Sequence, residues 1–449
     1  MKIWEKGIGL NEAVEKFTVG KDRDLDLYLA EHDVIGNIAH VMMLQKTGLL
    51  EPSEASSLIR ELRTIFRQIK ADQFSIEDTV EDVHSQLELM LTRKLGDSGK
   101  KIHSGRSRND QVLLDLRLFY RERIREVAES AKELFETLML QSEKYKDHLM
   151  PGYTHLQAAM PSSFGLWFGA YAESLVDDLI MLKAAYQVIN QNPLGSAAGY
   201  GSSFPIDRKM TTALLGFDDL NYNVIYAQMG RGKSEKTMSY ALASVAGTLS
   251  KFATDVCLYI NQNFNFISLP DEFTTGSSIM PHKKNPDVFE LIRAKCNKIQ
   301  SLPNEFHGIV NNLPSGYFRD LQMLKESALP VFEELINCLE ITTLAIRHMI
   351  IHDNILADEK YNHIFSVEEV NKKVLSGKPF RDAYKEIAHS IAAGDFKPDR
   401  EIKHSHEGSI GNLCNEDITN KFEQVYRAFP FKHVEEKINE LINDKTIEE

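Results

Sequence analysis

The feature that most restricts how this chain can fold is a long run from Gln111 to His148 that contains no glycine or proline. Apolar side chains recur in it at helical spacing, as at Leu113, Leu116 and Phe119. A helix of roughly 35 residues is a rod of about 50 Å. Comparable periodic stretches follow at 162–190, 234–262, 286–312 and 320–352. Long helices without strand-like alternation predict an all-α fold with a central long-helix bundle.

The length of 449 residues is enough for two or three domains. The long stretches are preceded by mixed, shorter helical segments and followed by shorter segments with more charge. We therefore expect an N-terminal helical domain over residues 1–110, the central bundle over 111–355, and a small C-terminal helical domain over 356–449.

Composition narrows the classes of partner. A net charge of −13 argues against binding to nucleic acid, although a few cations inside a cleft can still hold a small anionic substrate. The first residues lack a hydrophobic signal region, and no apolar run approaches the ~20 residues that cross a bilayer. The four cysteines form no CxxC pair. We interpret them as reduced thiols and expect a cytoplasmic protein without membrane contact.

The most informative short segment is Gly276–Asp287, with the sequence GSSIMPHKKNPD. Gly276 and the two serines leave the backbone free to close over a ligand. Asn285-Pro286-Asp287 predicts a helix start with Asn285 as the N-cap. Lys283 and Asn285 would then lie at the positive end of a helix, which favours an anion. An ordinary Gly/Ser loop before a helix is the alternative.

Other loops near the ends of the long helices also contain groups that suit a site. The arginines of 103–111 suit recognition of carboxylates, and His155 in 151–157 lies between a turn and a helix, where acid–base work is feasible. The Gly/Ala-rich stretch 192–201 permits close backbone approach, and 313–322 joins two helices. Taken alone, 103–111 could be an ordinary basic loop, and for the other three stretches an ordinary structural role is the favoured interpretation.

Residues 276–285 match Gly-Ser-Ser-x-Met-Pro-x-Lys-x-Asn at every fixed position. This string resembles the signature of the fumarase/aspartase/argininosuccinate lyase superfamily. Ser-Arg-Asn-Asp-Gln at 107–111 and Gly-Tyr-Thr-His-Leu-Gln at 152–157 resemble the argininosuccinate lyase forms of two further motifs. Residues 192–201 and 313–322 resemble other segments of that family.

The resemblance implies a β-elimination that releases fumarate and L-arginine from argininosuccinate, a step of arginine biosynthesis, through an aci-carboxylate carbanion. It implies that Ser277 is the base, that Lys283 stabilises the carbanion, and that His155, with Glu290 as its carboxylate partner, protonates the leaving nitrogen. It further implies a homotetramer with active sites shared between subunits, and neither a metal nor an organic cofactor. The residues implied to bind substrate are His84, Ser107, Arg108, Asn109, Thr154, Gln157, Asn285, Tyr317, Arg319 and Gln322.

Three departures from the family pattern keep alternatives open. Arg319 stands where the family usually has lysine, and Met323-Leu324 replaces Glu-Asp. The stretch 228–233, Gln-Met-Gly-Arg-Gly-Lys, occupies the region of a Ser-Arg-Asp segment and supplies its cations differently. The alternatives are another fumarate-forming C–N lyase, such as one acting on adenylosuccinate, or a non-catalytic crystallin-like homologue.

Overall fold

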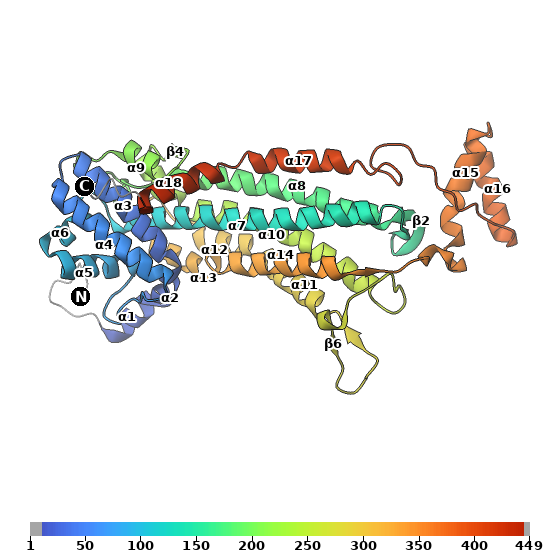
Figure 1. Cartoon of the computed structure of the whole chain (residues 1–449), viewed down its shortest axis with the longest axis horizontal. Helices are drawn as coiled ribbons and strands as arrows, with labels where there is room; N and C mark the ends of the chain where they lie inside the picture. The colour runs from blue at the N-terminus through green and yellow to red at the C-terminus, as the bar shows by residue number, and fades with distance from the viewer. Residues whose placement is uncertain (1–10, 444–449) are drawn as a thin grey trace.

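The computed structural model describes residues 11–443; residues 1–10 and 444–449, at the outer ends of the first and last predicted domains, lie outside the described part. The molecule is elongated, with short N-terminal helices at one end, long helices along the middle and two helices projecting at the other end (Figure 1). This architecture confirms the predicted all-α fold with a central long-helix bundle.

The N-terminal helices form their own core and pack on the start of the first long helix. Pro52 at the first helical position and a capping box between Glu51 and Glu54 start one of them. Their core continues into Leu114 and Leu118 of the first long helix. These helices are α1 (Glu12–Val19), α2 (Asp22–Asp26), α3 (Ala30–Lys46), α4 (Pro52–Lys70), α5 (Val83–Leu95) and α6 (Asp97–Lys100), with 3-10 turns η1 (Leu27–Leu29) and η2 (Lys101–His103).

The bundle consists of α7 (Arg108–Lys144), α8 (Phe164–Ile189), α10 (Val224–Tyr259), α11 (Asp287–Ile299), α12 (Leu302–Val310), α13 (Leu324–Ala328) and α14 (Val331–His348), with η4 (Arg319–Met323) before α13. Ser107 caps α7 in a capping box with Asp110, which explains why the longest helix begins there. α7 packs on α8 and α14, and α10 packs on α8 and α11. Between α7 and α14, the Phe332 ring lies 5.8 Å from Phe119 and 6.1 Å from Tyr120.

Two of the predicted long helices are wrong as single elements. The stretch 286–312 forms α11 and α12, because Pro303 in the first turn of α12 has no N–H with which to continue α11. The stretch 320–352 forms η4, α13 and α14, and Pro330 is the N-cap residue of α14. The expected N-cap at Asn285 is also wrong: Pro286 occupies that position, and Asn285 belongs to a short strand.

Helix α10 is broken near its start. Arg231 has ψ 140° and Gly232 has φ 81°, both outside helical values. A Cβ at position 232 would lie 2.7 Å from Val310 Cγ1, so a positive φ and a close approach both favour glycine there. The Gly232 N–H donates to Glu235 Oε2 at 2.7 Å, in the manner of a new helix cap. The helix predicted to start at Ser234 therefore corresponds to the part of α10 after the break.

The strands are short and lie at the ends of helices. The longest pair, β1 (Leu149–Thr154) and β2 (Gln157–Ser163), forms an antiparallel hairpin. The remaining pairs are β3 (Gln191–Asn192) with β4 (Asp219–Leu220), β5 (Ile267–Ser268) with β8 (Ile350–Ile351), and β6 (Thr275–Gly276) with β7 (Lys284–Asn285). Helix α9 (Arg208–Leu214) lies between β3 and β4 in the chain, and 3-10 turns η3 (Asp271–Phe273), η5 (Ile355–Ala357) and η6 (Glu359–Phe365) complete the connections.

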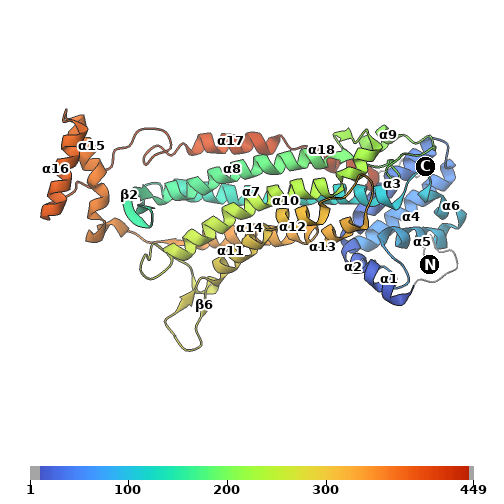
Figure 2. The ribbon, with the colours of Figure 1, turned by 180° about the vertical axis from the view of Figure 1, so that it is seen from behind.

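The last part of the chain is distributed along the whole molecule. α15 (Ser366–Leu375) and α16 (Phe380–Ala393) share a small apolar cluster at the far end. α17 (Asn415–Arg427) then returns along α8 and α7, and α18 (Phe431–Asn443) reaches α3 and α9 (Figure 2). Residues 356–443 thus contribute to both ends and to the bundle, and the domain boundaries at 110 and 355 stay a prediction.

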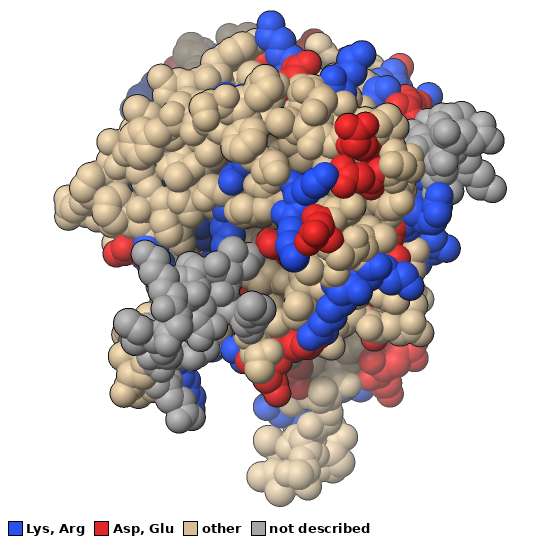
Figure 3. Space-filling model, turned by 90° about the vertical axis from the view of Figure 1, so that its left-hand side faces the viewer, with Lys and Arg blue, Asp and Glu red and all other residues tan. Residues whose placement is uncertain are grey.

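Basic and acidic side chains lie close to one another over much of the face at the N-terminal end (Figure 3). Within residues 11–443, no helix is long and apolar enough to pass through a lipid bilayer.

We expect Phe332→Ala to destabilise the fold strongly, because its fully buried ring fills the space between α7 and α14. Truncating a buried phenylalanine costs about 3–5 kcal/mol. Chemical denaturation followed by circular dichroism measures the loss. Glu340→Ala, at an exposed position of the same helix, is the control and should change little. Equal stability of Phe332→Ala and the wild type would contradict this picture of the core.

Candidate active site

A cavity of about 210 Å³ lies where the N-terminal helices meet the end of the bundle. It brings together segments that are far apart in the chain: α5, the first turn of α7, and the loop and η4 that follow α12. Six residues predicted from the sequence line it: His84, Arg108, Asn109, Tyr317, Arg319 and Gln322. The folding of the N-terminal domain onto the bundle therefore groups more than half of the residues implied to bind substrate.

This cavity presents both signs of charge. Arg108 Nη1 lies 3.2 Å from Glu81 Oε2 and 3.1 Å from Asp82 Oδ2. Burial opposes ionisation of Asp82, but His84 and Arg108 outweigh it and lower the pKa of this carboxyl. The pairing of cations with carboxylates suits a ligand that carries ammonium and carboxylate groups together.

Several side chains that line this cavity are not among the site residues predicted from the sequence. Lys325 is buried and lies 2.5 Å from Asp22 Oδ1 and 2.7 Å from Asp26 Oδ1. Arg231, at the break in α10, also lines it. Lys325 follows Gln322 by three residues, a spacing that places both on one side of a helical turn, and this signal was available in the sequence.

The end of α1 lies against the same cavity. Arg319 Nη2 donates to the Thr18 carbonyl at 2.8 Å, and Gln322 Nε2 donates to the carbonyls of Thr18 and Val19 at 3.2 Å. These two predicted substrate ligands therefore also fasten the N-terminal segment to the loop after α12.

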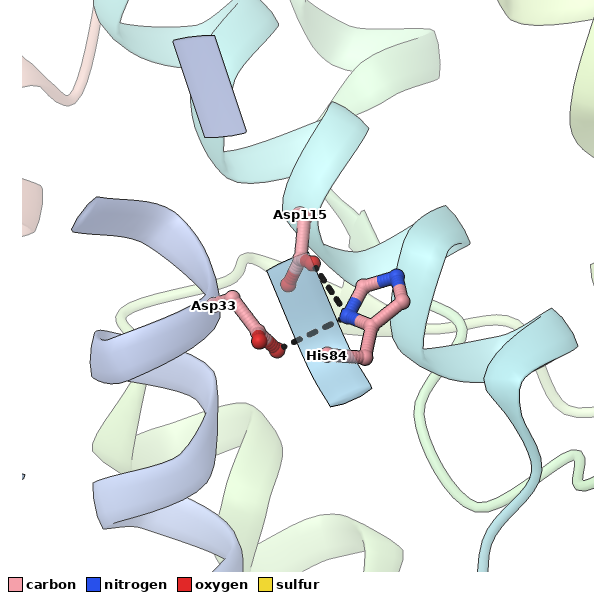
Figure 4. Close-up of side chains that lie close together, drawn as sticks. All are labelled: Asp33, His84 and Asp115. Carbon is pink, nitrogen blue, oxygen red and sulfur yellow. Dashed lines mark ion pairs between the residues drawn. The ribbon is translucent and has the colours of Figure 1, made fainter. Parts of the chain in front are cut away.

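His84 is buried, although it borders the cavity. Its Nδ1 lies 3.2 Å from Asp33 Oδ1 and 3.5 Å from Asp115 Oδ2, on α3 and α7 (Figure 4). Burial alone would lower the pKa of His84, but Asp33, Asp115 and Asp82 raise it to about 9. Gln111 Nε2 donates to Asp33 Oδ1 at 2.7 Å and holds that carboxylate in place. His84 is therefore an imidazolium at neutral pH and borders the cavity as a fixed cation.

The same three side chains form the one group in the described part of the chain whose ligand atoms lie close enough together for a metal ion, within 4.8 Å. A metal would need a neutral imidazole at His84, whereas the two carboxylates favour the protonated ring. The charge of this group therefore favours a proton on His84 over a metal ion.

The His155 motif lies elsewhere, on the tip of the β1–β2 hairpin. Thr154 pairs with Gln157, so His155 and Leu156 form a two-residue turn, and both have positive φ (54° and 58°). Such a turn is unusual without glycine or asparagine, and each residue costs of order 1 kcal/mol. The hairpin lies at the end of the bundle opposite the N-terminal helices (Figure 1), and Thr154, His155 and Gln157 are exposed on it.

The Ser277 motif forms an arm that projects from the side of the bundle at β6 (Figures 1 and 2). β6 and β7 close its base, where Asn285 Nδ2 donates to Thr275 Oγ1 at 3.4 Å and Thr275 donates to Asp287. This bonding explains why Asn285 belongs to the strand and does not cap α11. Ser277 Oγ accepts the N–H groups of Met280 at 3.1 Å and Ile279 at 3.4 Å.

The remaining predicted residues have simple surroundings. Ser107 Oγ accepts the Asn109 N–H at 3.3 Å as the cap of α7. Lys283 is exposed on the arm, and Glu290 is exposed on α11. The N-terminal helices that line the cavity, the β1–β2 hairpin and the arm at β6 lie at three separate positions (Figure 2). One chain therefore does not bring Ser277, His155 and His84 together.

Comparison with known proteins agrees with this architecture. A family model described as Lyase matches residues 12–301. Argininosuccinate lyase of Bacteroides thetaiotaomicron is 62% identical over 441 residues, which cover 98% of this chain and 99% of that protein. Argininosuccinate lyase of Thermotoga neapolitana is 38% identical over 86% of this chain and 97% of its own length. The crystal structure of EDDS lyase in complex with formate superposes with a TM-score of 0.76 at 22% identity, covering 97% of both chains, and supports the fold.

The long-helix bundle, with its motifs on loops at the helix ends, defines an enzyme of the lyase class in the fumarase/aspartase superfamily. Within that superfamily, the chain belongs to the argininosuccinate lyase family.

We expect the imidazole of His84 to titrate near pH 9, which NMR of histidine-labelled protein can measure. Because folding raises this pKa, the stabilising contribution of His84 is complete below about pH 6.5 and is lost as the pH rises through about 9. Asp33→Asn should lower the midpoint by removing the nearest carboxylate, whereas Asp72→Asn, at an exposed position, should not. A wild-type midpoint near 6.5 would contradict the assigned ion pairs.

Proposed function

We propose that the protein is an argininosuccinate lyase that converts argininosuccinate to L-arginine and fumarate, a step of arginine biosynthesis. The observation that carries this proposal is the 62% identity to an argininosuccinate lyase across 98% of the chain. Because the alignment covers nearly the whole chain, it includes both the reaction motifs and the loops proposed to face the substrate.

In the proposed reaction, Ser277 takes a proton from the succinyl carbon next to a carboxylate. The electron pair spreads into that carboxylate to form a dianionic aci-carboxylate. The C–N bond then breaks with its electron pair on nitrogen, the C=C bond of fumarate forms, and the departing nitrogen is protonated.

The turn around Ser277 supports its role as the base. A serine hydroxyl loses its proton near neutral pH only if its environment stabilises the alkoxide. Ser277 Oγ already accepts two backbone N–H groups, from Ile279 and Met280, and such donors favour the charged form. Lys283, on the same arm, adds a positive charge that is not held in an ion pair with any described carboxylate.

Lys283 and Asn285 are proposed to stabilise the aci-carboxylate. Both lie on the arm just before α11, whose first turn presents unpaired N–H groups and the positive end of the helix dipole. Thr154 and Gln157, on the hairpin, are proposed to bind the succinyl carboxylates together with them.

His155 is proposed to protonate the leaving nitrogen, with Glu290 as its carboxylate partner. The exposed two-residue turn holds the imidazole away from its own chain. Because backbone strain of this kind persists only when the surrounding structure fixes it, the turn holds the His155 backbone at a defined position on the hairpin tip.

The cavity at the N-terminal end is proposed to hold the arginine part of the substrate. Ser107, Arg108, Asn109, Tyr317, Arg319 and Gln322 are its proposed ligands, together with His84 as a fixed cation. Glu81 and Asp82 supply the negative charge that an amino or guanidinium group requires.

A homotetramer with active sites shared between subunits follows as a proposal from the separation of these three groups. One chain keeps them on different parts of a rigid bundle, so neighbouring copies must supply the missing motifs. Large apolar side chains exposed on the bundle helices support such contacts: Ile180, Met181, Tyr240, Leu291, Ile341 and Leu344. We place the enzyme in the cytoplasm, since its four cysteines are free thiols.

Fumarate release, followed by its ultraviolet absorbance, tests the substrate. We expect turnover with argininosuccinate and none with adenylosuccinate or aspartate, because the cavity carries the paired charges that an arginine moiety needs. Rapid fumarate formation from adenylosuccinate would replace the proposed substrate with that of the alternative lyase.

Ser277→Ala should reduce turnover by about 10²–10⁴-fold, because the proposed base is lost. Ser278→Ala, the adjacent serine, is the matched control and should retain most activity. Size-exclusion chromatography should give the same assembly for both. A Ser277→Ala enzyme of near-normal rate would remove serine from the role of base.

Shared sites can be tested by mixing two inactive variants, Ser277→Ala and His155→Asn. If the arm and the hairpin of one site come from different subunits, mixed assemblies contain some sites with both residues intact. Denaturing and refolding the two variants together should then restore part of the activity, whereas each variant treated alone should stay inactive. Failure of mixed assemblies to regain any activity would contradict sites shared in this way.

A further inference from the structure

A second cavity, of about 320 Å³, lies beside the break in α10, on the other side of the 313–318 loop from the candidate active site. Its charged lining residues are Arg231, Lys233 and Lys236, with no Asp or Glu among the described residues that line it. The remaining lining residues include Thr237, Ser315 and Gly316. A purely cationic cavity is notable on a chain with a net charge of −13.

Arg231 is the central observation. It is only 6% exposed, and its Nε has no hydrogen-bond partner. Nη2 donates to the Leu321 carbonyl at 3.2 Å, and the guanidinium lies 5.7 Å from the Tyr317 ring. Within residues 11–443, Arg231 forms no ion pair. Its charge favours the ionised form of Asp22, which lines the candidate active-site cavity, but the two side chains do not pair. A buried guanidinium without a carboxylate is costly, and this favours an anionic ligand.

The two lysines are likewise without a carboxylate partner among the described residues. The Lys233 ammonium lies 5.6 Å from the Tyr226 ring, and Lys236 Nζ lies 3.1 Å from His307 Nδ1. Both partners are aromatic rings, so the positive charge of the cavity is not neutralised by the protein. Elsewhere on the surface, lysines commonly pair with Glu or Asp, as Lys372 does with Glu369.

We propose that this cavity is an anion site that binds the phosphoryl group of a small metabolite, or free phosphate. A planar guanidinium donor next to two ammonium groups matches a multivalent phosphate better than a single carboxylate. The Ser315 hydroxyl supplies a further donor, whereas the Thr237 hydroxyl already donates to the Lys233 carbonyl at 2.9 Å. The site goes beyond the proposed lyase reaction: of its three cations only Arg231 also lines the candidate active-site cavity, and Lys233 and Lys236 do not line that cavity.

Isothermal titration of the full-length protein, at constant ionic strength, with inorganic phosphate and separately with ribose 5-phosphate tests the proposal. One anion should bind per chain. Lys233→Gln and Lys236→Gln should each weaken binding about tenfold, as loss of a charge-assisted hydrogen bond does. Lys251→Gln, at an exposed position of the same helix, is the matched control and should bind as the wild type does. Fumarate at saturating concentration should not displace the phosphate.

The relative affinity of the two probes separates the sources: tighter binding of ribose 5-phosphate assigns the site to a phosphorylated metabolite, and tighter binding of inorganic phosphate assigns it to the free ion. No binding of either probe at millimolar concentration would overturn the proposal. So would an equal loss of affinity in Lys251→Gln, or displacement by fumarate, which would place the anion in the substrate cavity. None of these results depends on whether argininosuccinate is the substrate.

Discussion

Burial of long apolar stripes between α7, α8, α10 and α14 is the constraint on which the rest of the molecule depends. α7 alone spans 37 residues, about 55 Å of rigid helix. Rods of this length fix the loops between them at opposite ends, because the packed helices cannot bend to bring those loops together. The positions of the cavity, the hairpin and the arm follow directly from this geometry, and their separation is the basis for proposing that neighbouring copies share each site.

The end of the bundle next to the N-terminal helices concentrates buried charge. Lys325 is matched by Asp22 and Asp26, and His84 by Asp33 and its neighbours. Burying such groups costs several kcal/mol for each ion unless partners compensate, so the packing is organised around these pairs. Arg231 differs because the described chain supplies no carboxylate for it. Arg231 lies at the break in α10 and lines both cavities. Its unpaired charge is the main basis for inferring an anionic ligand.

The two exposed motifs are locally ordered although they lack partners in one chain. Backbone N–H groups hold the Ser277 hydroxyl, and the positive-φ turn sets the backbone at His155. In the proposed shared sites, local order of this kind would lower the entropy lost when subunits meet, because the loops already have their shape. The arm base is held by β6–β7 pairing, and the hairpin by six paired positions.

The sequence by itself determined the fold class and the motif-bearing loops, because helical periodicity and short motifs are local properties of the chain. It missed the helix breaks before Pro303 and Pro330 and the strand position of Asn285, where prolines and a cross-strand bond outweighed the apolar pattern. Only the tertiary structure decided which charges meet: the Asp33–His84–Asp115 group joins three helices, and Lys325 finds its aspartates on α2. Such contacts depend on how the helices pack in space, and this packing cannot be inferred from residue spacing along the chain.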